Sequence, residues 1–574
     1  PEPNEPPVPP IPATITADAA DAGSADEHAR ASHATHLVRI GRTAELWHAP
    51  DGTAWATIPV NGHHEHWPIR SRHFREWLAR QFYLQTGRAA SAQSLQDATT
   101  ILEADAKFTG AEHPVFVRIA EHDGAVYLDL ADAHWRAVEI TADGWRVVPA
   151  PPVKFRRARG MEPLPEPVPG GSLELLRPFL NVAATDWPLV LGWLVMAFAP
   201  RGPYPVLALG GEQGSGKTTT ARVLRRLVDP NQADVRAEPR DTRDLAITAH
   251  NSWIICLDNA SRFAQWLSDA LCRLATGAGF AARELYSDNE ETILVAQRPI
   301  LITAVVDVVT APDLLDRSVQ VTCPVISDAE REPEAAFWSA FEAARPLILG
   351  ALCDAVSRAV RTREQVTLSW LPRMADFAIW ATAALGPESG FLERYQDNRA
   401  GAAGTALEFS PVSQAVLAFM ERRVSWSGTA QCLLDALNAD ADEETQRTRA
   451  RLRAWPKTAA GLSSELRRQS PALRASGLAV TWTRARDKRG TRTITLEWVR
   501  ATSPDTTGTP STASARQPVQ PHSHSPAEAH TRPAWQTPWP SDASDAPSVV
   551  SDAPALTERQ KQFAHQDKEI QLPL

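Results

Sequence analysis

The pattern of apolar and polar positions is most regular between residues 170 and 400, where short apolar runs alternate with helical patterns. Uninterrupted apolar runs bounded by polar loops are typical of strands buried on both faces, as in a parallel sheet covered by helices. Further helical patterns follow the last run and predict a helical lid. This segment is therefore predicted to be an α/β domain with a parallel sheet. Its four strand-like runs are PVLALG, WIICLD, PILITAVV and VQVTCPV.

Residues 37–165 carry a mixed pattern that predicts a small α/β accessory domain before the parallel sheet. Strand-like runs flank Asp51-Gly52, Asp123-Gly124 and Asp143-Gly144, and each of these pairs is a hairpin signal. The stretch SRHFREWLARQFYLQTG, which follows the first hairpin, predicts a helix.

Residues 410–500 predict a last globular unit, helical first and then with two strand-like runs, LAVTWTR and RTITLEWV. The stretch from WPKTAAGL to ALRASGL predicts a helix, a turn and a second helix. These features together are typical of a winged helix, whose second helix enters a DNA groove while the wing meets the backbone. Residues 1–36 and 501–574 are rich in Pro, Ala, Ser and Thr, and predict a disordered lead-in and a disordered tail.

The longest apolar stretch, residues 187–200, is too short for a membrane span, which needs about 20 residues. We therefore expect a buried helix there and no membrane association. The chain has five cysteines without a CxxC pair, which is neither a disulfide framework nor a zinc ribbon. This usage favours a reducing compartment, and we expect a cytoplasmic protein.

The net charge of the 574-residue chain is −9, which on its own argues against a nucleic-acid partner. The charge is segregated, however, because residues 447–500 hold fourteen basic and three acidic residues, a local balance of +11. The rest of the chain then carries −20. Because the basic segment coincides with the predicted winged helix, we expect it to bind DNA. The alternative is a solvated basic face on a protein-binding adaptor.

Within the basic segment, Leu462, Leu466 and Leu473 are expected to pack inward, which leaves the arginines of the same helix facing DNA. Basic residues on the wing would contact phosphates and give an affinity that falls steeply with salt. The predicted DNA-binding residues are Arg467, Arg468, Arg484, Arg486, Lys488 and Arg489.

A glycine-rich loop between the first apolar run and a helical pattern matches GxxxxGK[ST] from Gly211 to Thr218. Glycines let backbone N–H groups turn toward phosphates, and the following helix N-terminus adds its dipole. Lys217, the only lysine between Lys154 and Lys457, is expected to reach the β- and γ-phosphates of ATP, and the Thr218 hydroxyl is expected to bind Mg²⁺. The predicted nucleotide-binding residues are Gly211, Glu212, Gln213, Gly214, Ser215, Gly216, Lys217, Thr218 and Thr219.

Three later positions complete the predicted catalytic set with Lys217. Asp258 ends the second apolar run, where a carboxylate holds Mg²⁺ together with Thr218. Asn259 follows it and can orient water but cannot accept its proton, so hydrolysis is slow or a carboxylate such as Glu284 substitutes. Thr303, on the third run, is placed to touch the γ-phosphate and the water. Arg317 is placed to reach a neighbouring subunit's nucleotide, and the alternative is a surface arginine in a turn.

The chain resembles an AAA+ ATPase of the pre-sensor-hairpin group in the order of its motifs. These are GGEQGSGKTTT, the strand ending in Asp258-Asn259, a hairpin inserted over residues 283–297, Thr303 and LLDR. The likeness is to superfamily 3-type helicases and primase–helicases of phages, plasmids and integrated elements, and it covers residues 37–500. It implies a P-loop AAA+ core assembled as a homo-hexameric ring around DNA, with the hairpin lining the channel. The chain departs from the family at Asn259, where an acid is usual, and in its acidic hairpin tip (Asp288, Glu290 and Glu291).

Two other clusters are not assigned chemistry. Relatives of this type often carry a primase domain whose metal carboxylates lie as DxD or DxE, but Asp129 and Asp132 have the wrong spacing, so no primase activity is predicted. His63, His64 and His66 are predicted to lie in a polar loop, because residues this close on a turn rarely converge on one metal ion.

Together these features predict an ATP-dependent DNA helicase or translocase that acts in the replication of a mobile genetic element, with ATP and Mg²⁺ as cofactors. DNA and replication proteins are the expected partners. An ATP-gated DNA-binding switch or loader that never unwinds is the first alternative. A signalling ATPase with a protein-binding adaptor is the second.

Overall fold

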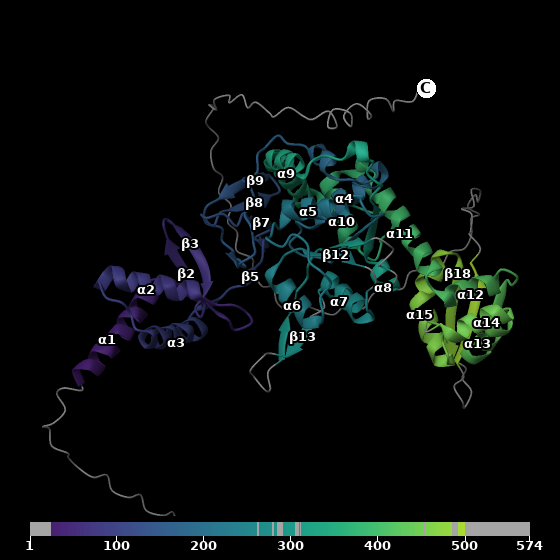
Figure 1. The fold of residues 1–574 in the computed structure, drawn as a ribbon, viewed down its shortest axis with the longest axis horizontal. Helices are drawn as coiled ribbons and strands as arrows, with labels where there is room; N and C mark the ends of the chain where they lie inside the picture. The colour runs from purple at the N-terminus through teal and green to yellow at the C-terminus, as the bar shows by residue number, and fades with distance from the viewer. Residues whose placement is uncertain are drawn as a thin grey trace, which may run out of the picture.

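The computed structural model describes residues 24–260, 263–277, 280–283, 291–294, 296–304, 309, 311–452, 454–484 and 492–499. Figure 1 shows three parts in chain order: an N-terminal unit, a central body and a C-terminal unit. No helix among the described residues is long and apolar enough to cross a membrane. Several predicted features lie outside these residues: most of the lead-in, the tail, Glu284, the hairpin residues Asp288 and Glu290, and the wing residues Arg486, Lys488 and Arg489.

The N-terminal unit packs three helices on a four-stranded sheet of order β3-β2-β1-β4. Leu37, Phe74, Phe82 and Leu102 are fully buried between the helices and the sheet. The elements are α1 (Ser24–Gly41), β1 (Glu45–His48), β2 (Ala54–Val60), β3 (His63–Pro68), α2 (Arg72–Thr86), α3 (Ala92–Phe108) and β4 (Ala111–Glu112). The predicted first hairpin and the predicted helix after it are both confirmed.

Two predictions for this unit are wrong. The lead-in ends earlier than residue 36, since α1 begins at Ser24 and the buried side chains of Leu37 and Ile40 hold this helix against its neighbours. His63, His64 and His66 lie in β3 rather than in a loop. Asn61 and Gly62, both with positive φ, form the tight turn between β2 and β3, and Asn-Gly is the strongest short-range hairpin signal in a sequence.

A second antiparallel sheet, of order β6-β7-β8-β9, contains β6 (Ile119–His122), β7 (Ala125–Asp129), β8 (Ala137–Thr141) and β9 (Gly144–Val148). Both predicted hairpin turns are confirmed. The sheet lies on α9 (Glu334–Thr362) and shares the main hydrophobic core of the central body, so it does not belong with the N-terminal unit as predicted.

A buried ion pair ties the start of this second sheet to the central body. Arg118 and Asp229, both essentially without exposure, are 3.2 Å apart, and Asp229 also accepts the backbone N–H groups of Trp253 and Ile254. Because an unpaired buried charge is costly, the pair fixes the sheet against the body. Arg118 also donates to the carbonyl of Asp129, at the end of β7.

The predicted parallel sheet is confirmed in the central body, within a mixed α/β fold. Four strands pair in the order β12-β15-β11-β16, all parallel. They are β11 (Val206–Gly210), β12 (Ile255–Ala260), β15 (Ile300–Ala304) and β16 (Ser318–Thr322). The helices around them are α4 (Trp187–Met196), α5 (Lys217–Val228), α6 (Thr242–Asn251), α7 (Gln265–Thr276), α8 (Pro312–Leu315), α9, α10 (Ala375–Leu385) and α11 (Phe391–Glu408). Because parallel strands end at one edge, the segments after β11, β12 and β15 meet there.

Short pairs complete this part of the chain. The strands β13 (Phe280–Arg283) and β14 (Glu291–Leu294) pair antiparallel, as predicted for the inserted hairpin. The strands β5 (Val115–Phe116) and β10 (Lys154–Phe155) pair in parallel where the N-terminal unit meets the central body.

Within its described residues, the C-terminal unit has four helices and a three-stranded antiparallel sheet of order β17-β19-β18. Its elements are α12 (Pro411–Met420), β17 (Ser425–Thr429), α13 (Ala430–Ala439), α14 (Glu443–Arg451), α15 (Ala459–Ala475), β18 (Leu478–Arg484) and β19 (Arg492–Trp498). The two predicted strands are confirmed, and β17 is an additional one.

The predicted helix, turn and helix are instead the single helix α15, which continues through Pro471. Proline lacks the N–H that would bond the carbonyl of Arg467, but the Ser470 hydroxyl donates to that carbonyl at 3.2 Å. The Ser-Pro pair therefore does not end the helix.

Candidate functional site

The glycine-rich loop joins the carboxyl end of β11 to the first residue of α5, Lys217. Gly211, Gly214 and Gly216 have φ values of 150°, 82° and 72°, which favour glycine. A Cβ atom on Gly211 would lie 2.5 Å from the carbonyl oxygen of Cys323, so only glycine fits. The loop thus turns sharply onto the N-terminus of a helix, an arrangement that offers backbone N–H groups to an anion.

Lys217 reaches back across this loop. Its Nζ donates to the carbonyl oxygens of Gly211 at 2.9 Å and Glu212 at 2.6 Å, and to the Ser215 hydroxyl at 3.3 Å. The side chain is buried, and Asn181 supports the loop by donating to the carbonyl of Ser215 at 2.9 Å. The ammonium group therefore lies where phosphate oxygens could replace these acceptors.

Four of the predicted site residues converge at the carboxyl edge of the sheet. The Thr218 hydroxyl donates to Asp258 Oδ1 at 2.9 Å, and the Thr303 hydroxyl donates to the same oxygen at 2.5 Å. The backbone N–H of Asn259 donates to the Thr303 hydroxyl at 2.9 Å. Asp258 is half-buried and Thr303 is buried. Carboxylate and hydroxyl oxygens at a phosphate loop are the ligand chemistry that Mg²⁺ prefers.

Asn259 lies at an irregularity in β12. The pairing of β12 with β15 shifts by one residue between Leu257 and Ala260, and Asn259 has a φ of 53°. Asparagine tolerates this left-handed conformation better than glutamate does. The backbone thus gives a physical reason for an amide here. The Asn259 side chain is exposed.

Arg317 lies at the opposite edge of the sheet. It immediately precedes β16, whose Ser318 pairs with Val206 while Thr322 pairs with Gly210 beside the loop. The length of the strand, about 16 Å at roughly 3.3 Å per residue, separates Arg317 from its own loop. Its side chain donates to the carbonyl of Asp313 at 2.6 Å and is 14% exposed. The structure therefore does not bring Arg317 to the other site residues of the same chain.

Sequence reasoning missed a cavity of about 320 Å³ beside the loop. Its aromatic and apolar wall comes from Phe179, Ile326, Phe337 and Trp338, and Gly216, Thr219 and Thr220 line it from the loop side. An Arg331 side-chain nitrogen lies 3.4 Å from the Cβ position of Gly214. These residues come from separate segments without a shared spacing, so no local pattern could have found them.

In the C-terminal unit, Leu462, Leu466 and Leu473 are buried as predicted. Arg467 is exposed and its guanidinium lies 5.6 Å from the ring centre of Trp482. Arg484 is exposed at the end of β18. The two predicted DNA contacts, one on α15 and one on the wing, thus face solvent.

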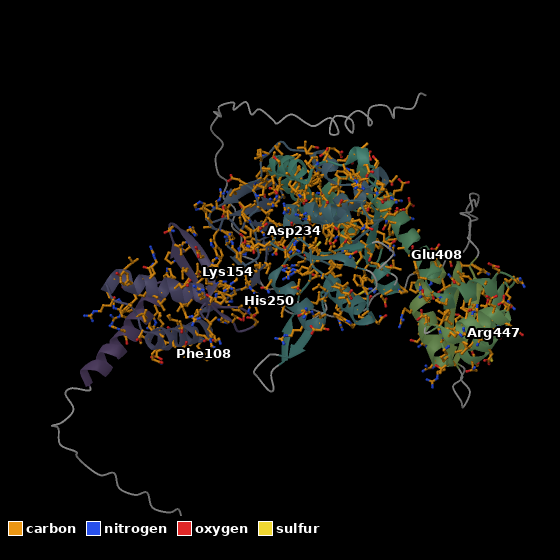
Figure 2. All side chains as sticks on the ribbon, viewed as in Figure 1. Phe108, Lys154, Asp234, His250, Glu408 and Arg447 are labelled. Carbon is orange, nitrogen blue, oxygen red and sulfur yellow. The ribbon has the colours of Figure 1, made fainter. Side chains whose placement is uncertain are left out.

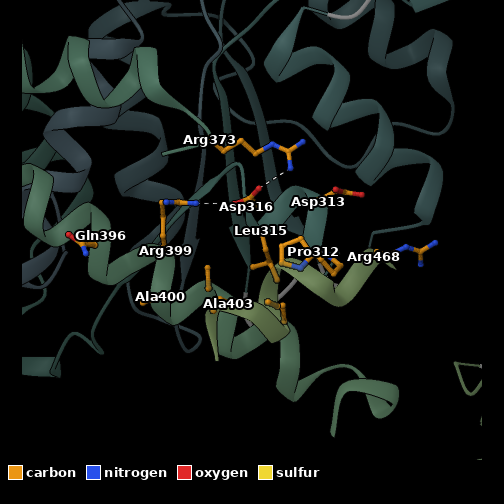
Figure 3. A pocket seen from close by; sticks show the side chains of 15 residues that line it. Pro312, Asp313, Leu315, Asp316, Arg373, Gln396, Arg399, Ala400, Ala403 and Arg468 are labelled. Carbon is orange, nitrogen blue, oxygen red and sulfur yellow. Dashed lines mark hydrogen bonds and ion pairs between the residues drawn. The ribbon is translucent and has the colours of Figure 1, made fainter. Parts of the chain in front are cut away.

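Arg468, on the neighbouring position of α15, is exposed as well. It pairs with Glu465 at 3.2 Å and lines a cavity of about 290 Å³ between α15 and the helices α8 and α11. Figure 3 shows this cavity, with Arg468 beside Pro312 and with Asp316 paired to Arg373 and Arg399. Asp313 and Asp316 form its acidic wall.

The chain is similar to solved structures of the apo C-terminal region of NrS-1. Two of them share 10% and 12% sequence identity with it, each with a TM-score of 0.35, and each match covers 81% of this chain and 98% of the other. No curated protein matches the chain.

Two sequence families match adjoining parts of the chain. Residues 173–398 match the family described as the actinomycete integrative conjugative element replication protein. Residues 412–514 match the C-terminal domain of the same replication protein, RepA. The first match contains the glycine-rich loop, Asp258, Thr303 and Arg317, and the second contains the basic segment. The two matches relate this chain to the replication protein family of actinomycete integrative conjugative elements.

Proposed function

We propose that this replication protein is an ATP-dependent DNA motor, a helicase or translocase that acts at the replication of its element. The observation that carries the proposal is the convergence of Lys217, Thr218, Asp258 and Thr303 at one sheet edge beside a helix N-terminus. This combination of donors and acceptors suits a nucleoside triphosphate with its magnesium ion.

The residues fit Mg²⁺-ATP, whose bound metal would neutralise charge on the β- and γ-phosphates. Thr218 and Asp258 would hold the metal through oxygen atoms. Lys217 would exchange its bonds to the carbonyls of Gly211 and Glu212 for bonds to phosphate oxygens. The cavity lined by Phe337 and Trp338 would take the adenine ring. Thr303, already bonded to Asp258, would link the γ-phosphate to the strand β15.

Arg317 supports assembly as a ring. It lies one strand length from its own loop, so it does not reach the nucleotide site of its own chain. In the proposed hexamer each Arg317 would stabilise the charge on the neighbouring subunit's phosphates.

The C-terminal unit supplies the proposed DNA contact. The local balance of +11 over residues 447–500, with Arg467 and Arg484 exposed, suits the phosphate backbone. Binding through such contacts weakens as salt rises because counterions are released on association.

The test compares Lys217→Ala with Lys107→Ala, which removes an exposed lysine from α3. We expect the first to abolish DNA-stimulated ATP hydrolysis and the second to leave it unchanged. Hydrolysis that survives Lys217→Ala would refute the assignment of this loop.

Asn259 favours one alternative, an ATP-gated DNA-binding switch or loader. An amide can orient water but cannot take its proton, and no carboxylate follows Asp258 directly. Strand displacement on forked DNA discriminates between the two functions. Unwinding coupled to hydrolysis supports the motor, whereas ATP-dependent binding without unwinding supports the switch.

A further inference from the structure

The strand β12 is at one edge of the parallel sheet, and the chain around Arg236 lies along its outer side. The backbone N–H of Arg236 donates to the carbonyl of Cys256 at 3.0 Å, and the carbonyl of Arg236 accepts from the N–H of Asp258 at 2.8 Å. Arg236 is therefore one strand spacing, about 4.8 Å, from the proposed metal ligand Asp258. It is close to the nucleotide site without being part of it.

A cavity of about 310 Å³ lies between this edge and α6. It is lined by residues of the stretch 236–248 and by Leu257, and Figure 2 labels Asp234 and His250, which lie just outside the two ends of that stretch. The lining combines charged and apolar side chains, and Ile247 among them is 51% exposed. The cavity shares no lining residue with the one beside the glycine-rich loop, so it is a separate feature of this side of the molecule.

Arg236 is a half-buried cation without an anion. Its Nε atom is buried without a hydrogen-bond partner, and no ion pair of its side chain is found in the part of the chain that the structure describes. Burial and the charge of Arg225 lower the pKa of Arg236, and the charge of Asp229, already paired with Arg118, offsets this only in part. Because an uncompensated charge in such a place is costly, a carboxylate that arrives from outside would stabilise it.

The carboxylate that fits is Asp313, at the opposite edge of the sheet. The strand β16 forms that edge, and α8 leads into it through Arg317. The Asp313 side chain is 66% exposed, and it approaches Arg317 only to 4.0 Å. Asp316 is already paired with Arg373 and Arg399, and Figure 3 shows Asp313 pointing away from those pairs. Asp313 is therefore the acidic side chain of α8 that is free to meet another surface.

The spacings on the two edges match. Arg317 donates to the carbonyl of Asp313 at 2.6 Å, so the two residues lie close together beside α8. An arginine that reaches the phosphates at Asp258 of another subunit therefore brings Asp313 close to Arg236 of that subunit. Figure 1 shows α6 and α8 apart in one chain, with α7 between them. A contact between them thus joins two different surfaces, which is the head-to-tail association that closes into rings.

From these observations we propose that Asp313 of one subunit docks on Arg236 of the next subunit, at the cavity between β12 and α6. The contact rests on the proposed function, because it forms when Arg317 enters the neighbouring nucleotide site. A charge-assisted hydrogen bond would satisfy Arg236, and the docked α8 would cover part of Ile247. The pair would then fix the position of Arg317 relative to the neighbour's phosphates.

Sedimentation velocity of the full chain, with Mg²⁺ and a non-hydrolysable ATP analogue, measures subunit association directly. Arg236→Asp or Asp313→Arg alone places two like charges in contact and should weaken association at least about tenfold. The double variant Arg236→Asp/Asp313→Arg exchanges the two charges and should restore association to within about threefold of the wild type.

Two further variants guard against a folding defect. Arg236→Gln removes the charge but keeps a polar side chain in the half-buried position, and it should weaken association in the same direction as Arg236→Asp. Arg75→Asp reverses an exposed charge on α2, in the N-terminal unit, and should leave association unchanged.

ATP hydrolysis separates the docking contact from the proposed function. The single reversals weaken assembly alone, so their activity per subunit should recover as the protein concentration rises, whereas Lys217→Ala should stay inactive at every concentration. If wild-type chains assemble but neither reversal weakens assembly, or the double variant is not restored, the docking contact is refuted and the motor stands. DNA-stimulated hydrolysis by a wild-type monomer would refute the ring and the docking contact together.

Discussion

Replacing Thr303 with valine removes one hydroxyl from the centre of the site while conserving the shape of the side chain. The hydroxyl is buried, donates to Asp258 Oδ1 at 2.5 Å and accepts from the backbone N–H of Asn259 at 2.9 Å. Valine can make neither bond, so Thr303→Val leaves the Asn259 N–H without its acceptor. The register shift between Leu257 and Ala260 keeps this N–H out of the strand pairing with β15.

The expected magnitude follows from these two hydrogen bonds. A hydrogen bond to a charged group contributes about 1.5–3 kcal/mol and a neutral one about 1 kcal/mol. Asp258 is only half-buried and retains its bond from Thr218, so water recovers part of the loss. We expect a local destabilisation of about 2 kcal/mol, which corresponds to roughly 30-fold faster opening around Asn259.

Amide hydrogen exchange resolved at Asn259 measures this opening directly. Thr303→Val should accelerate exchange of this amide about 30-fold, whereas Thr303→Ser, which keeps the hydroxyl, should leave it close to the wild-type rate. ATP hydrolysis should fall at least tenfold in the valine variant with ATP binding retained, because Thr303 is proposed to act on the γ-phosphate. Unchanged exchange and unchanged hydrolysis in Thr303→Val would show that the hydroxyl has neither role.

Three further predictions concern other parts of the molecule. Mixing inactive Arg317→Ala and Lys217→Ala chains should restore part of the ATPase activity, because some subunit interfaces then combine an intact loop with an intact arginine. If no activity returns, Arg317 does not act on a neighbouring subunit's nucleotide. Burial lowers the pKa of His66 to about 3 in the folded chain. Between about pH 6.5 and 3 the unfolded chain therefore binds one more proton than the folded chain. The free energy of unfolding should fall by about 1.4 kcal/mol per pH unit as the pH drops through that window. Chemical denaturation at several pH values checks this, and the slope should be one proton smaller in His66→Gln. Arg467→Ala and Arg468→Ala should each reduce the slope of log binding constant against log salt by about one, as measured by DNA titration at several salt concentrations.

The parallel sheet and the sharp turn of the glycine-rich loop were predictable because their signals are local. Buried strands appear as apolar runs, and the loop needs glycine at fixed positions, as the positive φ angles of Gly211, Gly214 and Gly216 show. Asp258 and Thr303 were predictable because each stands at or near the end of an apolar run. Parallel pairing then brings these ends together.

Features that depend on tertiary contacts were not predictable in the same way. The sheet of β6–β9 has ordinary hairpin signals, but only its packing on α9 decides that it belongs to the central body. Pro471 indicates a break in α15, and the compensating bond of Ser470 becomes visible only in three dimensions. The surroundings of His66 depend on Lys154, which bonds the Thr57 hydroxyl from a distant part of the sequence.

The packing of α15 joins the basic C-terminal unit to the central body. One face of α15, which includes Ala472, lies against α8 and the small side chains Ala402 and Ala406 of α11, while Arg467 and Arg468 are exposed. This exposed basic face is the one that we propose to contact DNA. The same short helix α8 leads directly into Arg317, so the proposed DNA-binding helix and the arginine proposed to act on a neighbouring subunit rest against one element. We expect a shift of α15 on DNA to be passed on through α8 and through the larger contact of α15 with α11.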